Sequence, residues 1–254
     1  MKRQTEAVII GGGVIGCSIA YHLAKLGMND VVLLERQELT SGSSWHAAGG
    51  VHGLHDTNNI ARLQYYTMNL YRELEQETGQ SVGFHQTGYL YLAQTEDRAH
   101  QLRISAAKAR QFSGVEFHEI SLEEAAQRHP FVNLDGIRMA FWESESGHVD
   151  VNGVTHAYAQ AARNRGVSIE RFCPVLETNP RPDGGWDVVT EKGTIQTRVL
   201  VNAAGLWGRE VARLAGLELP LMPLEHQYFV TEEIPKVAAL DFELPAVADR
   251  DGEY

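Results

Sequence analysis

The sequence has few cysteines, no basic run and no long apolar stretch. Its two cysteines, Cys17 and Cys173, form no motif, and so small a number favours a reducing compartment. Lysine plus arginine number 22 against 33 aspartate plus glutamate, a formal net charge of −11. This balance argues against nucleic acid and anionic membrane surfaces as partners. No apolar leader and no apolar run of about 18 residues is present, so we expect no membrane association. We expect a cytoplasmic protein, or a mitochondrial matrix protein if a leader was removed.

The end of the sequence indicates that the chain is a fragment. Residues 249–254 have the composition of a turn that leads into a strand, but the sequence stops there. Internal repeats and low-complexity segments are also absent. We therefore expect a longer natural protein, and a full-length product of 28.2 kDa would contradict this expectation.

The first 35 residues follow the order strand, glycine turn, helix, strand and acid. Residues 6–10 form a short apolar run, and residues 31–34 form a second one. Between them, apolar side chains recur at helical spacing up to a stop at Gly27, namely Ile15, Ile19, Leu23 and Leu26. Two apolar strands joined by one helix predict a right-handed βαβ unit with a parallel sheet.

The glycine turn has the pattern Gly-x-Gly-x-x-Gly, formed by Gly11, Gly13 and Gly16. The first glycine permits the tight turn, the second lets the backbone approach a pyrophosphate, and the third allows close helix–strand packing. The following helix presents free N–H groups and a partial positive charge to phosphates. Glu35 ends the second strand, where its carboxylate can accept hydrogen bonds from both ribose hydroxyls. This order predicts a dinucleotide site, with a ligand-free glycine turn as the alternative.

This pattern alone does not decide between NAD and FAD. Glu35 disfavours NADP because it would repel a 2′-phosphate, although the adjacent Arg36 weakens that argument. Residues 41–50 read Ser-Gly-Ser-Ser-Trp-His-Ala-Ala-Gly-Gly, a segment that can lie against a ligand with its backbone donors exposed, and this favours a flavin. Within it, Trp45 and His46 are the only bulky pair. A neutral imidazole is a nucleophile that can bond to the flavin 8α carbon, so His46 is a candidate for covalent attachment. A packed or capping histidine is the alternative.

The rest of the chain predicts a second structural layer that alternates with the first. We expect helices at residues 59–78, 96–112 and 151–164, and a capping box formed by Ser121 and Glu124. We expect strands at residues 88–94, 136–143, 168–172, 186–190, 199–205 and 222–231. The predicted class is α/β, with a Rossmann-type FAD-binding domain interleaved with a mostly antiparallel α+β substrate domain. The predicted FAD-binding domain comprises 1–80 and 144–216, and the substrate domain 81–143 and 217–254.

The remaining polar and aromatic candidates give weaker signals. His52 and His55 with Asp56 have too few further ligands nearby, so we expect no metal site there or elsewhere. Tyr89 and Tyr91 alternate along one predicted strand and indicate core or a wall of the substrate domain.

Several segments together resemble the dimethylglycine and sarcosine dehydrogenase family of D-amino-acid-oxidase-like flavoproteins. These are residues 11–16, Glu35, 41–49, 77–80, 83–86 and 201–207. The resemblance covers essentially the whole chain, and the Trp-His-Ala-Ala-Gly motif at residues 45–49 is its most specific part.

The resemblance implies that His46 is linked through a ring nitrogen to the 8α position of FAD. It implies an FAD site formed by Val14, Ile15, Glu35, Arg36, Gly42, Ser43, Ser44, Trp45, His46, Ala47, Ala48, Gly49, Gly50, Val175, Gly205 and Trp207. His226 resembles the position that faces the substrate side of the flavin, and Tyr254 resembles the start of an aromatic site.

The chain departs from the family pattern in two ways. Val151 stands where family members usually have proline after the aspartate of the Gly-His-Val-Asp segment. Family members also continue well beyond this length, with a glycine-rich segment that closes over the flavin and often a folate-binding domain.

The resemblance predicts an FAD-dependent amine dehydrogenase or oxidase. Its substrate would be a secondary or tertiary amine such as dimethylglycine or sarcosine, which transfers hydride from an N-methyl carbon to flavin N5. Electrons would pass to an electron-transfer flavoprotein or to oxygen, and folate could take part only through a further C-terminal domain. The alternatives are a non-covalent FAD amino-acid oxidase and a non-catalytic FAD-binding subunit that needs a partner.

Overall fold

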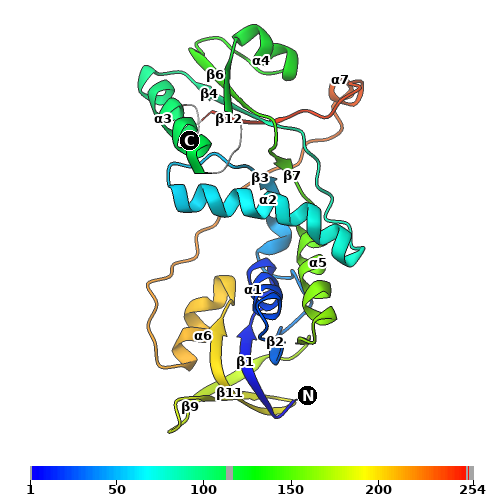
Figure 1. Ribbon diagram of the computed structural model, residues 1–254, viewed down its shortest axis with the longest axis vertical. Helices are drawn as coiled ribbons and strands as arrows, with labels where there is room; N and C mark the ends of the chain where they lie inside the picture. Colours follow the sequence, from blue (N-terminus) through cyan, green and yellow to red (C-terminus); the bar gives the residue numbers. More distant parts are fainter. Residues whose placement is uncertain (1, 113–116, 250, 252–254) are drawn as a thin grey trace. The chain divides into compact units, whose positions relative to one another are not determined.

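The computed structural model describes residues 2–112, 117–249 and 251, which form two compact units (Figure 1). Unit 1 comprises Met1–Ala48, Leu74–Val82 and Asp150–His226, and unit 2 comprises the remainder. Residues 49–73 and 144–149 thus belong to unit 2 and residues 81–82 and 217–226 to unit 1, which differs from the predicted boundaries. Tyr254 and most of the predicted terminal turn lie outside the described residues. Within the described part of the chain, no helix has the length and apolar character that crossing a membrane requires.

Unit 1 is built on a six-stranded sheet in the order β8-β2-β1-β11-β10-β9. Its strands are β1 (Gln4–Ile10), β2 (Val31–Leu34), β8 (Ser168–Glu170), β9 (Val175–Pro180), β10 (Trp186–Thr190) and β11 (Gly193–Asn202). Strand β1 pairs in parallel with β2 and with β11, and β2 pairs in parallel with β8, whereas β9 and β10 join as antiparallel strands. Helices α1 (Val14–Lys25) and α5 (Val151–Asn164) pack against each other and against strands of this sheet (Figure 1). This arrangement confirms the predicted α/β class.

Residues 7–10 of β1 and all of β2 are buried on both faces, which is why they read as continuous apolar runs. Val8 and Val32 belong to a cluster with Val188 and Ile195, and Val211 of α6 (Gly208–Leu214) packs against it. Their neighbours in sequence point to the opposite face because side chains alternate along a strand.

The buried face of α1 is formed mostly by small residues. Ile15 and Leu26 are 63% and 85% exposed, whereas the buried positions are small, apart from Tyr21: Gly16, Cys17, Ala20 and Ala24. Helix α1 packs on α5, whose buried positions include Ala157 and Ala161. Small side chains let two helix backbones approach closely, so packing selected the alanine and glycine face rather than the isoleucine and leucine positions.

Burial makes the Cys17 thiol unreactive. Desolvation raises its pKa to about 12, and its Sγ lies 3.6 Å from the carbonyl oxygen of Gly12. Because the thiolate is the reactive form, we expect no alkylation of Cys17 by iodoacetamide in the native protein at mildly alkaline pH. Peptide mass spectrometry after labelling with and without urea measures this. Equal labelling in the two conditions would contradict the expected protection.

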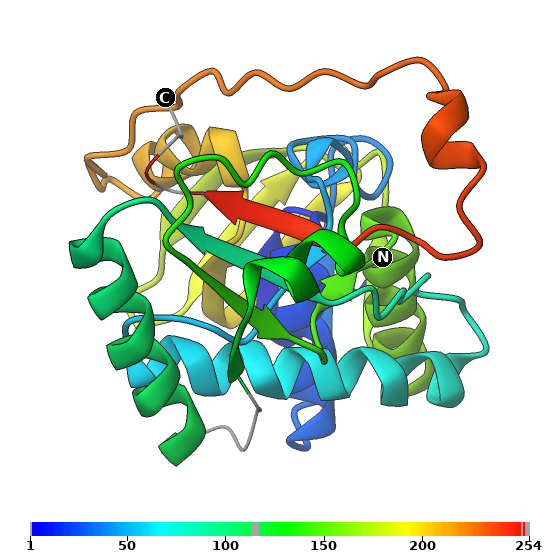
Figure 2. The same ribbon diagram turned by 90° about the horizontal axis from the view of Figure 1, so that it is seen from above.

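Unit 2 contains a four-stranded sheet in the order β12-β4-β6-β5. Its strands are β4 (Tyr89–Ala93), β5 (Phe117–Ile120), β6 (Met139–Glu143) and β12 (Ala246–Asp249), with a smaller antiparallel pair of β3 (Gly50–Val51) and β7 (Gly147–His148). Strands β4, β5 and β6 are antiparallel, and β12 lies beside β4 in parallel (Figure 2). The remaining helices are α2 (Asn58–Thr78), which begins in unit 2 and ends in unit 1, α3 (Glu96–Phe112), α4 (Leu122–Arg128) and α7 (Pro235–Ala238).

Two local predictions have different outcomes. The Ser121 hydroxyl accepts a hydrogen bond from the Glu124 N–H at 3.1 Å, as the capping box requires. The strand predicted at residues 222–231 is wrong, because this stretch is irregular and exposed. A strand needs a neighbour for its backbone hydrogen bonds, and none of the described strands pairs with it.

Candidate functional site

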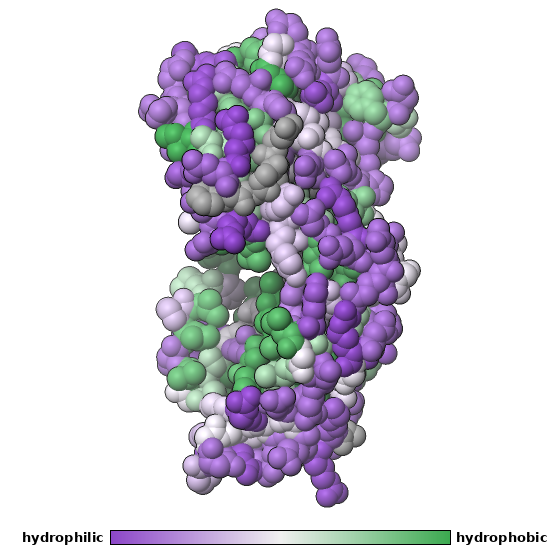
Figure 3. Space-filling view, viewed as in Figure 1, coloured by the Kyte–Doolittle hydropathy of each residue, from purple (hydrophilic) through white to green (hydrophobic). Residues whose placement is uncertain are grey.

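A cleft in unit 1 joins the glycine turn, the N-terminal end of α1 and the segment of residues 41–48, which we call the serine–glycine loop. Its volume is about 530 Å³, within the range of sites that hold cofactors. Apolar side chains contribute much of its lining, and Figure 3 shows hydrophobic residues gathered over and beside α6. We call this space the unit 1 cleft; its lining residues at the turn and loop are Gly11, Gly12, Gly13, Val14, Ile15, Glu35, Arg36, Ser41, Gly42, Ser43, Ser44 and Ala47.

The glycines of the turn are required by close backbone contacts. Gly11 has φ of +116°, and a Cβ there would lie 2.3 Å from the carbonyl oxygen of Ala203. A Cβ on Gly16 would lie 1.9 Å from the carbonyl oxygen of Gly11. The turn therefore brings β1, α1 and the segment after β11 together with no space for side chains, and it leaves the helix terminus open to the cleft.

Glu35 is fixed at the end of β2 by backbone donors. The Gly12 N–H donates to its Oε2 at 2.7 Å, and the Gln37 N–H donates to its Oε1 at 2.8 Å. The side chain is almost fully buried, yet it lines the cleft. Each carboxylate oxygen has a further lone pair, so the position remains suited to accept ribose hydroxyls.

The serine–glycine loop is held against the start of α1. The Ser44 hydroxyl accepts a hydrogen bond from the Val14 N–H at 2.9 Å. Thr40, which precedes the loop, has φ of +71°, a rare conformation for a β-branched residue, and its N–H donates to the Gly12 carbonyl oxygen at 3.2 Å. Strained backbone of this kind is concentrated at functional sites. This conformation of Thr40 could not be predicted from the sequence, because threonine does not favour positive φ.

Arg36 and Trp207 form a stacked pair in the lining of the cleft. The guanidinium carbon of Arg36 lies 3.7 Å from the centroid of the Trp207 ring, a cation–π contact. The turn that carries Trp207 is ordered by Asn202, whose side-chain amide donates to the Gly208 carbonyl oxygen at 2.7 Å. A Cβ on Gly42 would lie 3.3 Å from the Trp207 ring, so the loop passes close beside this pair.

His46 lies at the end of the short helix η1 (Ser44–His46), which packs on α5. Its ring lies against Trp45, with ring centroids 3.6 Å apart and planes inclined at 34°. The side chain is exposed and does not line the cleft, although Ser44 and Ala47 on either side of the pair do.

The cleft thus assembles most, but not all, of the predicted cofactor residues. It includes Val175, Gly205 and Trp207 from the C-terminal part of unit 1. Gly16, Trp45, His46 and Ala48 lie outside its lining, and Gly49 and Gly50 belong to unit 2. His226 is exposed in the irregular segment after α6 and does not line the cleft, so its substrate-facing role stays a prediction.

Several lining residues were missed in the sequence. They are Ile10, Leu34, Ser41, Cys173, Pro174, Ala203, Ala204, Leu206, Glu210, Val211 and Leu214, together with the middle glycine, Gly12. Val211 and Leu214 of α6 could have been found in the sequence, because apolar residues three positions apart share one face of a helix.

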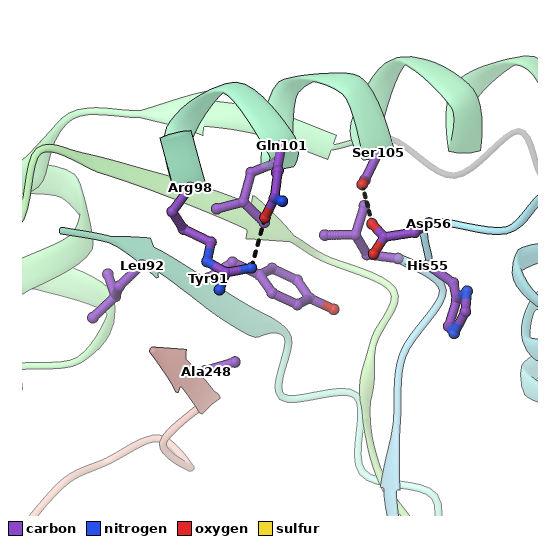
Figure 4. A pocket seen from close by; sticks show the side chains of 10 residues that line it. His55, Asp56, Tyr91, Leu92, Arg98, Gln101, Ser105 and Ala248 are labelled. Carbon is purple, nitrogen blue, oxygen red and sulfur yellow. Dashed lines mark hydrogen bonds between the residues drawn. The ribbon is translucent and has the colours of Figure 1, made fainter. Parts of the chain in front are cut away.

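Unit 2 has a smaller pocket beside α3, where Tyr91 is one of the lining residues (Figure 4). The Tyr91 hydroxyl donates to Oε2 of Glu143 at 2.8 Å, and the Gly53 N–H donates to Oε1 at 2.6 Å. Burial raises the pKa of the Glu143 carboxyl, and its hydrogen bonds partly oppose this effect.

The neighbouring polar residues do not converge on one point. Figure 4 shows Asp56 bonded to Ser105 of α3, and His55 Nδ1 accepts instead from the Thr57 N–H at 3.0 Å. His55 and Asp56 therefore have separate structural partners.

Comparisons with known proteins agree with the geometry of the unit 1 cleft. Residues 6–254 match the family described as FAD dependent oxidoreductase (DAO). The chain is 45% identical over its whole length to mitochondrial dimethylglycine dehydrogenase of Rattus norvegicus, and 37% identical over 99% of its length to mitochondrial sarcosine dehydrogenase of Homo sapiens. It spans only 29% and 28% of these two relatives.

A solved structure supports the same conclusion. L-proline dehydrogenase from P. horikoshii superposes with a TM-score of 0.78 and 28% identity, over 85% of this chain and 57% of that one. The glycine turn, the acid at the end of β2 and these likenesses together show that the chain belongs to the family of FAD-dependent oxidoreductases.

Proposed function

We propose that the protein oxidatively demethylates a secondary or tertiary amine, such as dimethylglycine or sarcosine, with FAD held in the unit 1 cleft. The observation that carries the proposal is the cleft itself, in which the glycine turn, Glu35 and the serine–glycine loop surround one space. The likeness to dimethylglycine and sarcosine dehydrogenases supports the amine as substrate. When bound, FAD accepts a hydride from a carbon next to the amine nitrogen.

Different residues of the cleft would bind different parts of the cofactor. The end of α1, at Gly13 and Val14, offers backbone amides and a positive dipole to the pyrophosphate. Glu35 would accept the ribose hydroxyls, and the stacked pair of Arg36 and Trp207 would contact the adenosine end. No residue of this set needs to transfer a proton, so its work is binding and orientation.

We further propose that His46 carries the flavin covalently. Its immediate neighbourhood supports the assignment, since Ser44 and Ala47 line the cleft while His46 itself is exposed. An imidazole at the rim of the unit 1 cleft can reach a bound flavin without displacing the residues that line the cleft. The contact with Trp45 limits the orientations of the His46 imidazole.

The same proposal covers where the electrons and the carbon of the N-methyl group go after the hydride transfer. Hydride loss leaves an iminium, which water hydrolyses to the demethylated amine and formaldehyde. Electrons would leave through an electron-transfer flavoprotein or oxygen. Transfer of the carbon unit to folate would require a part of the protein beyond this chain.

Anaerobic mixing of the natural-length holoprotein with candidate amines tests the proposal. We expect dimethylglycine or sarcosine to bleach the oxidised flavin, with one formaldehyde formed for each flavin reduced. Betaine is the matched control, because it has N-methyl groups but no nitrogen lone pair to stabilise the iminium.

Two other results would contradict the proposal. Reduction by glycine or other primary amino acids, with no reaction of N-methylated ones, would favour the amino-acid oxidase. Tight FAD binding without reduction by any amine would favour a non-catalytic subunit.

A further inference from the structure

Two histidines of unit 2 lie side by side on separate segments. The N–H of His85 donates to the carbonyl oxygen of His148 at 2.9 Å, and the N–H of His148 donates to that of His85 at 3.0 Å. Residues that exchange both bonds in an antiparallel pair project their side chains from the same face. The two imidazole rings accordingly stack, with centroids 5.0 Å apart and planes inclined at 14°.

This backbone pair is held closely by its surroundings. A Cβ on Gly147 would lie 1.9 Å from the carbonyl oxygen of His85, so only glycine permits the approach. The hydrogen-bonded backbone therefore keeps the two histidines side by side, while their side chains can still rotate.

A carboxylate from a third segment reaches both rings. Glu243, which precedes β12, places Oε2 at 2.8 Å from Nδ1 of His85 and Oε1 at 2.6 Å from Nε2 of His148. One ligand atom from each of the three residues lies within 4.8 Å of the others. All three side chains are about half exposed, so solvent ions have access to them.

We propose that His85, His148 and Glu243 form a binding site for a divalent transition-metal ion, with Zn²⁺ as the best match. Two imidazoles and one carboxylate are a known zinc ligand set, which leaves a fourth position for water. Bond lengths of about 2.0–2.2 Å imply ligand atoms about 3.3 Å apart in a tetrahedral site. The carboxylate already lies closer than this to each nitrogen, so a zinc ion would enter by displacing the two hydrogen bonds while the nitrogens move together.

The bound ion would connect parts of unit 2 that are distant in sequence. Glu243 is 95 positions from His148 and 158 from His85. A metal that bridges them would fix the segment leading into β12, the strand at the edge of the unit 2 sheet. Binding to the folded form alone stabilises it, so metal should raise the midpoint of thermal unfolding.

Zinc titration of the full chain, after removal of metals with a chelator, tests the site. Isothermal titration calorimetry and metal analysis after dialysis should show one saturable site that is lost in His148→Gln. Glutamine keeps a donor for Glu243 but is a poor zinc ligand, so we expect binding to weaken more than about ten-fold, the loss that even an outer-shell change produces. His100→Gln, at an exposed position of α3, is the matched control and should bind as the wild type does.

Thermal unfolding with and without zinc gives a second readout. The midpoint should rise with zinc in the wild type and in His100→Gln, but not in His148→Gln. Glu243→Gln is the second variant, because its side chain can still hydrogen-bond both rings, and it should also lose the zinc effect. The proposal would be overturned if His148→Gln and Glu243→Gln bound zinc as tightly as the wild type, or if the wild type showed no saturable binding.

Discussion

Replacement of His46 by alanine should abolish all flavin that survives acid precipitation. The imidazole is the proposed nucleophile toward the 8α carbon, and alanine has no group that could replace it. Reversible FAD binding should persist, because His46 does not line the unit 1 cleft. Fluorescence of the acid-precipitated and washed polypeptide measures the covalent flavin, and absorbance of the native protein measures the total.

His100→Ala is the control, since it removes an exposed histidine from α3 in unit 2 and should leave acid-stable fluorescence unchanged. Flavin released into the supernatant from the wild-type protein would support the non-covalent oxidase instead. Acid-stable flavin that persists in His46→Ala would place the attachment at another residue.

The change Gly16→Ala should destabilise unit 1 by about 3 kcal/mol, the upper end for overpacking, and should prevent FAD binding. The added methyl group would lie 1.9 Å from the Gly11 carbonyl oxygen, a backbone atom that cannot rotate aside. Relief requires α1 to move away from the glycine turn, which displaces the helix terminus from the cleft. Urea unfolding and FAD titration by fluorescence quenching measure the two effects.

Gly50→Ala is the matched control, because a Cβ there has no atom within 4 Å and its φ is not positive. It should change the unfolding free energy by less than about 0.5 kcal/mol, as surface substitutions usually do. If Gly16→Ala were as stable as the wild type and bound FAD equally well, the glycine turn would be looser than the structure indicates.

The first 35 residues could be predicted because their signals are local. The strand, turn, helix and strand are contiguous, and each boundary is marked by a glycine or an acid. The packing face of α1 does not follow from the same segment, because hydrophobicity favours Ile15 and Leu26 while close contact with α5 requires small residues. Ile15 instead lines the cleft, a role that depends on loops far along the chain.

The parts that were missed depend on pairing between distant segments. Strand β12 has only four residues, and the residues of β4 that pair with it, such as Tyr89 with Ala246, lie 157 positions earlier. The segment 222–231 has strand-like composition, but composition cannot supply a neighbouring strand. The cluster of His85, His148 and Glu243 was likewise invisible, because only the fold brings three isolated residues together.

The interleaved connectivity of unit 1 has a consequence for folding during synthesis. Strand β1 lies between β2 and β11, and Glu6 of β1 forms an ion pair with Arg198, which is 192 positions away. One edge of β1 therefore remains unpaired until most of these 254 residues have been translated. Contacts of such long sequence separation slow folding, and apolar β1 and β2 would be exposed throughout this interval. The nascent chain therefore carries an unpaired, aggregation-prone strand edge until β11 emerges and completes the sheet.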